Sequence, residues 1–372
     1  MAHSDTLLGM PAEMFDLIVE STEKKDSRHL RLVSHECAAK VLNTFRERCF
    51  TSLKVMLATE SSITDTIDII KHPDFGRTVK SLPLVDDTAT DPTHFWFNPE
   101  YERLKRDAMS LEKAVAAFNA QRSMRGSGED RRLLKQLFRE CGEVAVKSVH
   151  FQSYDGGQWS ATGEWQVEAD IPTEWQAGDD HCLFTVILAI ASSTVQFDDF
   201  SMTAEHGRGI PISQYGSQPQ KGVICKAALS HFDVLNLSVC AHDLDDGGLK
   251  QDAREFWSMM TELNIRSLEV QGWKYDEGED VPTLTTLMEH DFPYMTSLTL
   301  HEFRLGWDDL VSFLRRQKSL RNLDVLFTTV GDTPQGLDNT ICAELSRVSG
   351  VPRVKEEGAR SDWFDWEEMD SE

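Results

Sequence analysis

Apolar residues recur at helical spacing along the first fifty residues of the chain, on short segments that polar turns separate. Met14, Leu17 and Ile18 follow one another at i, i+3 and i+4, which predicts a single apolar stripe on one helix. Pro11 fits the first turn of that helix, because its missing N–H would have no partner there. The charged residues 20–25 predict the turn that ends the helix.

Two further short helices follow in this pattern. Asp26 or Ser27 can cap a second helix that carries Leu30 and Val33 on one face. Ser34 can cap a third helix, whose apolar positions are Cys37, Val41 and Phe45. Segments this short cannot bury a sufficient core of their own. The pattern therefore predicts a small helical unit with spare apolar surface, which is typical of a docking module.

The rest of the chain repeats a different pattern of six residues. It consists of one apolar residue, two polar residues, a second apolar residue, one polar residue and a third apolar residue. Six segments share it and predict strands: 79–84, 146–151, 232–237, 265–270, 295–300 and 320–325. Helical strings such as 309–316 lie between the later ones. Four leucines recur along these segments at spacings of 33, 30 and 25 residues, namely Leu235, Leu268, Leu298 and Leu323, which resembles an irregular leucine-rich repeat.

A unit of one strand and one helix cannot bury its own apolar face, so neighbouring units must stack. The expected fold class is therefore α/β: a curved solenoid with parallel strands on its concave side and helices on its convex side. An ordinary α/β domain is the alternative, because the spacing drifts and the usual asparagine or cysteine ladder is missing. In a solenoid, the outward-pointing strand residues on the concave side are the expected contacts for a target protein: Arg266, Glu269, Thr296, Thr299, Arg321 and Asp324.

Three stretches predict loops, because they are polar or rich in glycine, serine and proline: 86–99, 121–128 and 204–222. We expect disorder in each. The second stretch separates two helical strings, 101–118 and 130–138. The acidic end of the chain, 355–372, also predicts a disordered tail that aids solubility. Exposed tryptophan and phenylalanine side chains favour burial, so the alternative that this tail folds back over a basic spot on the solenoid stays open.

The charge balance narrows the possible partners. The chain of 372 residues has a net charge of −24, and such a surface repels phosphate backbones and anionic lipids. We therefore expect a protein partner and neither nucleic acid nor a membrane. Seven scattered cysteines without a Cys-x-x-Cys pair, and the lack of a signal-peptide pattern, predict a reducing compartment, the cytoplasm or the nucleus. The most apolar window, 182–191, is also too short to cross a bilayer.

No pattern of catalytic or metal-binding residues stands out. The sequence has no Walker loop, no Gly-x-Ser-x-Gly elbow and no His-Glu-x-x-His motif. Residues 243–248 suggest a calcium loop, but Arg254 stands where its glutamate ligand belongs. His181, Cys182 and His231 lack partners at metal-ligand spacing. We therefore predict no catalytic residue, no metal and no cofactor.

The N-terminal segment resembles the F-box, a three-helix module of roughly forty to fifty residues. The resemblance rests on Met10-Pro11-x-Glu13 at the start of the first helix, Ile18 near its end, Asp26 at the start of the second helix and 30–34 at its close. Segment 45–55 is similar to the strand that follows the F-box in many filamentous-fungal members, and 68–82 also fits them. Three positions depart from the family: leucine is usual at Thr22 and Ser27, and tryptophan or phenylalanine at Cys37. Each change would remove apolar area from a docking surface.

This resemblance implies a non-catalytic, substrate-recruiting subunit of a Skp–cullin–F-box ubiquitin ligase. The helices would bind a Skp-type adaptor and, through it, a cullin–RING ligase, while irregular leucine-rich repeats would hold an unknown target protein. The implied contacts with the adaptor are Leu8, Met10, Pro11, Glu13, Ile18, Leu30, Leu32 and Val33. The expected domains are the F-box at 1–50, the repeat-like domain at 51–354 and the tail at 355–372.

Two other functions stay open. The chain could be a Skp-bound scaffold for assembly or trafficking without ubiquitin transfer, which accumulation of a protein in cells that lack this chain would separate from a ligase subunit. It could also be an enzyme with a pocket in the solenoid. The lack of a clustered nucleophile, metal set or phosphate loop argues against the enzyme, and turnover of a small molecule by the purified chain would support it.

Overall fold

The computed structural model describes the parts of the chain that carry the fold. These are residues 10–22, 29–30, 32–86, 108–144, 146–153, 181–203, 210–240, 249–272, 282–301, 303–326, 329–330 and 339–356. The chain divides into two compact units, Met1–Asp199 and Phe200–Glu372. Each unit is described by itself.

The first unit begins with helices and continues into strands. Its elements are α1 (Ala12–Ser21), α3 (His35–Phe50), β1 (Val55–Met56), α4 (Glu60–Lys71), the short 3-10 turn η2 (Gly76–Thr78), β2 (Ser81–Asp86), α6 (Ala108–Ser127), α7 (Glu129–Val144), β3 (Ser148–Ser153), α8 (His181–Ala191) and β4 (Phe197–Thr203), whose last residues belong to the second unit.

The second unit alternates strands and helices. Its elements are β5 (Ile210–Pro211), α9 (Ile212–Ser217), α10 (Pro219–Leu229), β6 (Phe232–Cys240), α11 (Leu249–Thr261), β7 (Ile265–Gln271), α12 (Pro282–Met288), β8 (Ser297–His301), β9 (Arg304–Leu305), α13 (Trp307–Arg316), β10 (Asn322–Leu326), β11 (Thr329–Val330), α14 (Asn339–Ser349) and β12 (Arg353–Glu356).

The strands form a parallel sheet, which confirms the predicted α/β class. Ten described strands belong to this sheet, and β9 pairs with β11 in a separate ribbon. The order is β1-β2-β3-β4 in the first unit and β6-β7-β8-β10-β12 in the second, where β5 lies beside β6. Within each unit the order of the strands in the sheet follows their order in the chain. Parallel neighbours need a crossover connection between them, and a helix usually supplies it.

A row of leucines runs across the strands of the second unit. Leu237, Leu268, Leu298 and Leu323 are paired in register, and each is at most 2% exposed. The prediction named Leu235 in this row, and it is wrong by two residues. Leu235 pairs with Ile265, three residues before Leu268, and it is Leu237 that lies beside Leu268. The register shifts by one residue between Leu235 and Asn236.

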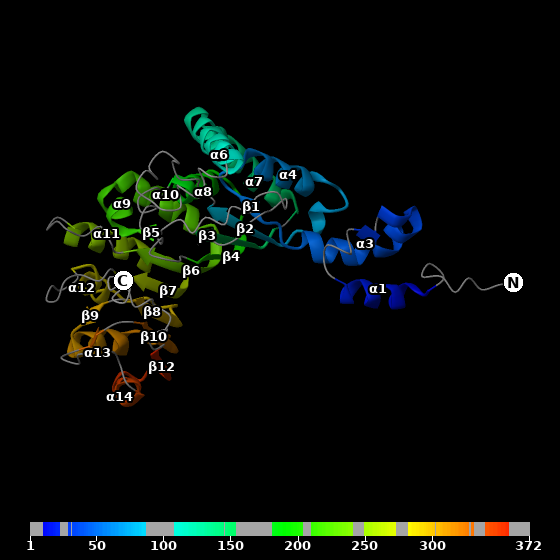
Figure 1. Cartoon of the computed structure of the whole chain (residues 1–372). Coiled ribbons are helices and arrows are strands. Elements are labelled where there is room, and N and C mark those ends of the chain that lie inside the picture. The colour runs from blue at the N-terminus through cyan, green and yellow to red at the C-terminus, as the bar shows by residue number, and fades with distance from the viewer. Residues whose placement is uncertain are drawn as a thin grey trace, which may run out of the picture. The chain divides into compact units, whose positions relative to one another are not determined.

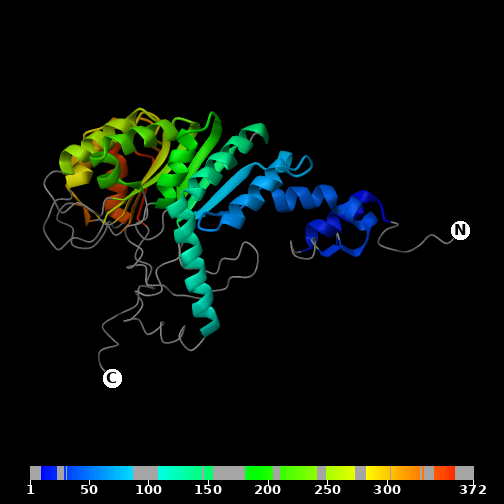
Figure 2. The same cartoon turned by 90° about the horizontal axis from the view of Figure 1, so that it is seen from above.

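The buried face of the sheet is covered by helices whose apolar stripes turn inward. Leu310, Phe313 and Leu314 of α13 are buried, whereas its acidic first turn is exposed. In Figure 1, α12, α13 and α14 lie on the same side of β8, β10 and β12, and each helix packs against the next. In the first unit α4, α7 and α8 lie side by side (Figure 2). Burial of these stripes supplies most of the stabilisation.

Three expectations from the sequence are wrong. Residues 121–127 belong to α6 and only Gly128, with a φ of 71°, breaks the helix before α7, because Gln121 and Met124 are held in the core. Segment 45–55 is not one strand: α3 continues to Phe50 and the strand contains only Val55 and Met56. Residues 210–222 form β5, α9 and the start of α10 rather than a disordered loop.

The remaining predicted elements are largely confirmed. The six predicted strands correspond to β2, β3, β6, β7, β8 and β10, and the helical string 309–316 lies within α13. Of the expected loop 86–99, Asp86 is the buried last residue of β2, and 87–99 lie outside the described residues. So do 101–107, 204–209 and 357–372, which include most of the expected acidic tail.

Candidate functional site

The N-terminal helices enclose a small core of their own. Phe15 and Val19 of α1 pack against Cys37 and Val41 of α3, and Leu30 lies partly buried against this cluster. Phe15 and Val19 are four residues apart, so they share one face of α1. The helix thus turns Phe15 and Val19 inward, rather than the predicted stripe of Met14, Leu17 and Ile18.

Three polar side chains of α3 hold α1 along its length. Lys40 Nζ donates to the carbonyl oxygen of Met10 at 3.0 Å. The Thr44 hydroxyl donates to Asp16 Oδ1 at 2.7 Å. The guanidinium of Arg48 donates to the carbonyl oxygens of Val19 and Thr22. The Val19 carbonyl oxygen also accepts from the amide and the hydroxyl of Thr22, so Arg48 adds a further donor there. Arg48 also binds the carbonyl oxygen of Thr22, just beyond the end of α1.

The same helices leave an apolar face exposed. Met14 and Leu17 of α1 are 52% and 59% exposed, and Leu32 and Val33, just before α3, are 82% and 69% exposed. Six large apolar side chains are exposed in the part of the chain that the structure describes, and these are four of them. Ser34 follows at once, and its hydroxyl accepts from the Cys37 amide at 3.1 Å, which confirms the predicted cap of the third helix.

The helical unit is joined firmly to the strands of the first unit. Phe50, the last residue of α3, stacks on Phe75 with ring centroids 4.5 Å apart. Arg46 forms an ion pair with Asp74 at 3.0 Å. Gly76 lets η2 pack closely on the end of α4, because a Cβ there would lie 1.9 Å from the carbonyl oxygen of Ile70. α1 and α3 are therefore fixed to the start of the sheet in the first unit (Figure 1).

The residues predicted to contact an adaptor fall into different environments. Leu32 and Val33 are exposed, as is Pro11, whereas Met10 and Ile18 are half-buried. Leu30 belongs to the internal core of the helical unit. Leu8 and the side chain of Glu13 lie outside the described residues.

Met14 and Leu17 were missed as contact candidates, although both stood in the apolar stripe predicted from the sequence. The larger ring of Phe15, spaced four residues from Val19, was the signal that the neighbouring face turns inward. Met14 and Leu17 are therefore left on the outer face of α1, beside solvent.

Two of the departures from the F-box pattern affect something other than a docking surface. Cys37 is 2% exposed in the internal core, so its small side chain reduces packing within the unit. The Thr22 hydroxyl donates to the carbonyl oxygen of Val19, and Thr22 terminates α1. Ser27 lies outside the described residues.

The residues predicted to contact a target lie along three neighbouring strands. Glu269, Thr299 and Asp324 are paired in register and form one row on the partly exposed face of the sheet in the second unit. Glu269 also contacts His301 Nε2 at 3.0 Å and accepts from Gln271 at 3.0 Å. The other three lie three residues earlier in the chain, and alternation does not place them in this row. Arg266 is the second residue of β7, and Thr296 and Arg321 come immediately before β8 and β10.

Several titratable groups are placed without forming a reactive cluster. His181 Nε2 lies 2.6 Å from Asp130 Oδ2 and so joins α8 to α7. Burial raises the pKa of the Cys141 thiol, and it raises that of Cys225 to about 12. Both thiols therefore stay protonated at neutral pH, and a protonated thiol is a poor nucleophile.

Metal-ligand clusters and membrane spans can be assessed only where the chain is described. No group of three histidine, cysteine, aspartate or glutamate side chains that could hold a metal ion occurs among the described residues. The described helices include none that is long and apolar enough to span a membrane. Residues 243–248, which suggested a calcium loop, lie outside the described residues.

Comparisons with known proteins leave the family open. No protein-family model matches this chain, and no curated protein gives a significant match. The resemblance to the F-box thus stays a prediction that depends on residues 10–34.

Proposed function

We propose that this protein is the substrate-recruiting subunit of a Skp–cullin–F-box type ubiquitin ligase. The helical unit of α1 and α3 binds a Skp-type adaptor, and the strands that follow hold a target protein. The chain performs no covalent step. It raises the effective concentration of target lysines near the ubiquitin-transferring enzyme.

One observation carries this proposal: the helical unit has filled its own core and still exposes Met14, Leu17, Leu32 and Val33. Four exposed large apolar side chains on one small helical unit favour a protein partner. Burying them would stabilise a complex by roughly 25 cal/mol for each Å² removed from water. A partner that supplies an apolar helix face would match them, which is how an F-box is expected to meet its adaptor.

The attachment of α3 also supports a recruiting role. The Phe50–Phe75 stack and the Arg46–Asp74 ion pair fix the helical unit to the first unit. A bound adaptor would therefore keep a constant position relative to β1 and β2.

The second part of the proposal concerns the target. In the second unit the strand order follows the chain order, and the leucine row faces the helices, which supports an irregular leucine-rich repeat. The opposite face presents the row of Glu269, Thr299 and Asp324. We propose this row as the place where the target binds.

The proposal is tested by co-purification of the full chain with a Skp-type adaptor. The double variant Leu32→Asp, Val33→Asp places two charges on the exposed face, and we expect it to lose the adaptor. The variant Val223→Asp is the matched control, because Val223 of α10 is 69% exposed, as Val33 is. Its recovery of the adaptor should equal that of the unaltered chain.

Two results would contradict the proposal. The unaltered chain could recover no adaptor, or Val223→Asp could reduce recovery as much as the double variant does. Thermal unfolding of all three chains shows that the loss is one of binding, because substitutions at exposed positions change stability little.

A further inference from the structure

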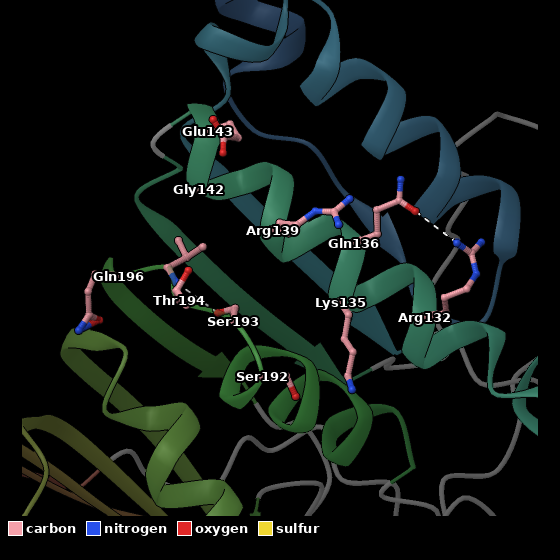
Figure 3. Close-up of a pocket in the computed structure, with 11 residues that line it drawn as sticks. Arg132, Lys135, Gln136, Arg139, Gly142, Glu143, Ser192, Ser193, Thr194 and Gln196 are labelled. Carbon is pink, nitrogen blue, oxygen red and sulfur yellow. Dashed lines mark hydrogen bonds between the residues drawn. The ribbon is translucent and has the colours of Figure 1, made fainter.

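A groove on the first unit lies away from the N-terminal helices. It has a volume of about 940 Å³ and lies between α7 and the segment 192–196 that joins α8 to β4. Figure 3 shows the side chains of α7 along one wall and those of Ser192–Gln196 along the other. All of its lining residues belong to the first unit.

The groove is positively charged, although the chain as a whole is strongly acidic. α7 contributes Arg132, Lys135 and Arg139, and Glu143 is the one acidic residue of the lining. These cations are spaced at i, i+3 and i+7, so they form one stripe along the helix. The whole chain carries a net charge of −24. A local excess of positive charge on such a protein marks a place where anions are attracted.

The cations of the groove are available to a ligand. Arg132 donates to both carboxylate oxygens of Glu129 and to Gln136, and Arg139 pairs at 3.1 Å with the half-buried Glu140. An acidic ligand must compete with these partners for two exposed arginines, and ion pairs at exposed positions contribute about 0–1 kcal/mol. Among the described residues, no acidic side chain pairs with Lys135, which is exposed.

The two walls of the groove are held in place by the core. Leu133, Leu134, Leu137 and Phe138 anchor α7 from the opposite side of the helix. At one end of the groove Gly142 lets the loop approach, because a Cβ there would lie 2.8 Å from Val195 Cγ2. The backbone of both walls is therefore held in place before a ligand binds, which lowers the entropic cost of binding.

The other wall adds uncharged polar groups. Ser193 and Thr194 belong to the extended segment before β4, and Thr194 is exposed. The Ser192 hydroxyl donates to the carbonyl oxygen of Leu188, which holds this serine at the end of α8. Hydroxyl groups beside cations favour anionic oxygens, because such hydrogen bonds are charge-assisted.

The shape of the stripe selects the kind of anion. From Arg132 to Arg139 the helix rises roughly 10 Å, which matches about three residues of an extended peptide. A single phosphate ion is too small to meet cations spread over this length. A nucleic acid is longer than the stripe, and a chain with a net charge of −24 would repel those of its phosphates that come within a Debye length, about 8 Å, of acidic side chains.

We infer that this groove binds a short, extended acidic segment of a protein partner. Carboxylates spaced along this segment pair one after another with Arg132, Lys135 and Arg139. The inference does not depend on the adaptor, because no residue of α1 or α3 lines the groove. Loss of binding at one of the two places would therefore leave the other unaffected.

The test uses the full chain and two labelled peptides of about six residues, long enough to fill the groove. One alternates aspartate with serine, and the other alternates asparagine with serine. We expect saturable binding of the aspartate peptide, little binding of the asparagine peptide, and weaker binding as salt is raised. Lys135→Glu should weaken binding at least about tenfold.

Arg131→Glu is the matched control, because Arg131 is exposed on the same helix and does not line the groove. It brings the same change in charge, and we expect it to weaken binding by less than about twofold. Thermal unfolding confirms that both variants are folded.

Four results would overturn the inference. The aspartate peptide could fail to bind, or the two variants could weaken binding equally. Inorganic phosphate at low concentration could displace the peptide, which would show a site for a free anion. An oligothymidylate could displace it as effectively as unlabelled peptide does, which would show unselective binding of polyanions.

Discussion

The contacts of Arg48 provide a direct test of how α1 is held in place. Its guanidinium donates to the carbonyl oxygens of Val19 and Thr22, the latter at 2.7 Å, near the end of α1. Replacing Arg48 with methionine keeps most of the apolar stem and removes both hydrogen bonds. The hydrogen bonds from Lys40 and Thr44 remain, and so does the packing of Phe15 and Val19 against α3.

The expected cost follows from these two bonds. Hydrogen bonds to charged groups contribute about 1.5–3 kcal/mol each, and partial exposure reduces this to roughly 1 kcal/mol each. The variant should therefore make local opening of α1 easier by roughly 2 kcal/mol, which corresponds to about a thirtyfold change in the opening equilibrium.

Amide hydrogen exchange measures this opening. In Arg48→Met the amides of α1 should exchange about thirtyfold faster, while those of α7 keep their rates. Arg131→Met is the control, because Arg131 is an exposed arginine of α7. Unchanged exchange in α1 of Arg48→Met would refute the reasoning, as would equal acceleration in the control.

Three further predictions concern stability, and thermal unfolding checks each. Gly128→Ala should lower the free energy of unfolding by roughly 1 kcal/mol, and with it the melting temperature, because the φ of 71° at Gly128 disfavours a side chain. Gly126→Ala within α6 should raise both by a similar amount. Phe138→Ala should cost about 3–5 kcal/mol, because the ring is fully buried. Burial, and then the charge of Asp198, raise the pKa of Asp199, so the folded state binds that proton more tightly and gains stability as the pH falls through this raised pKa. Asp199→Asn should therefore stabilise the protein at neutral pH, and Asp198→Asn should not, because it breaks the ion pair with Lys147.

The sequence predicts the strands of the second unit well, because alternation and burial agree there. Leu268, Leu298 and Leu323 are buried on parallel, in-register strands, and a leucine between polar neighbours is a strong signal for such a strand. The error at Leu235 has a different cause. Leu235 and Leu237 are both buried on the same face of β6, and the pattern of one strand does not say which of them pairs with Leu268.

The errors in the first unit have a different origin. Gly126 and the serines beside it predict a loop, but buried Gln121 and Met124 hold that part of α6 in the core. β4 went unpredicted, because the adjacent Asp198 and Asp199 break the alternation of its apolar residues. In both cases tertiary contacts outweigh local propensity.

The candidate docking surface could be predicted only in part. The spacing of Met14, Leu17 and Ile18 indicates a helix, but it does not say which face is turned inward. Phe15 and Val19 fill that role, which leaves Met14 and Leu17 exposed. The groove on α7 could not be predicted, because its second wall comes from residues 192–196, far along the chain.

Calorimetric titration of the purified full chain with a purified Skp-type adaptor tests the central claim most directly. Because Met14, Leu17, Leu32 and Val33 would leave water, we expect saturable binding with a negative change in heat capacity. Leu32→Ala should weaken this binding by roughly thirtyfold, since it removes most of a side chain worth about 2 kcal/mol when buried. Absence of binding by the unaltered chain, or equal affinity of Leu32→Ala, would contradict the claim.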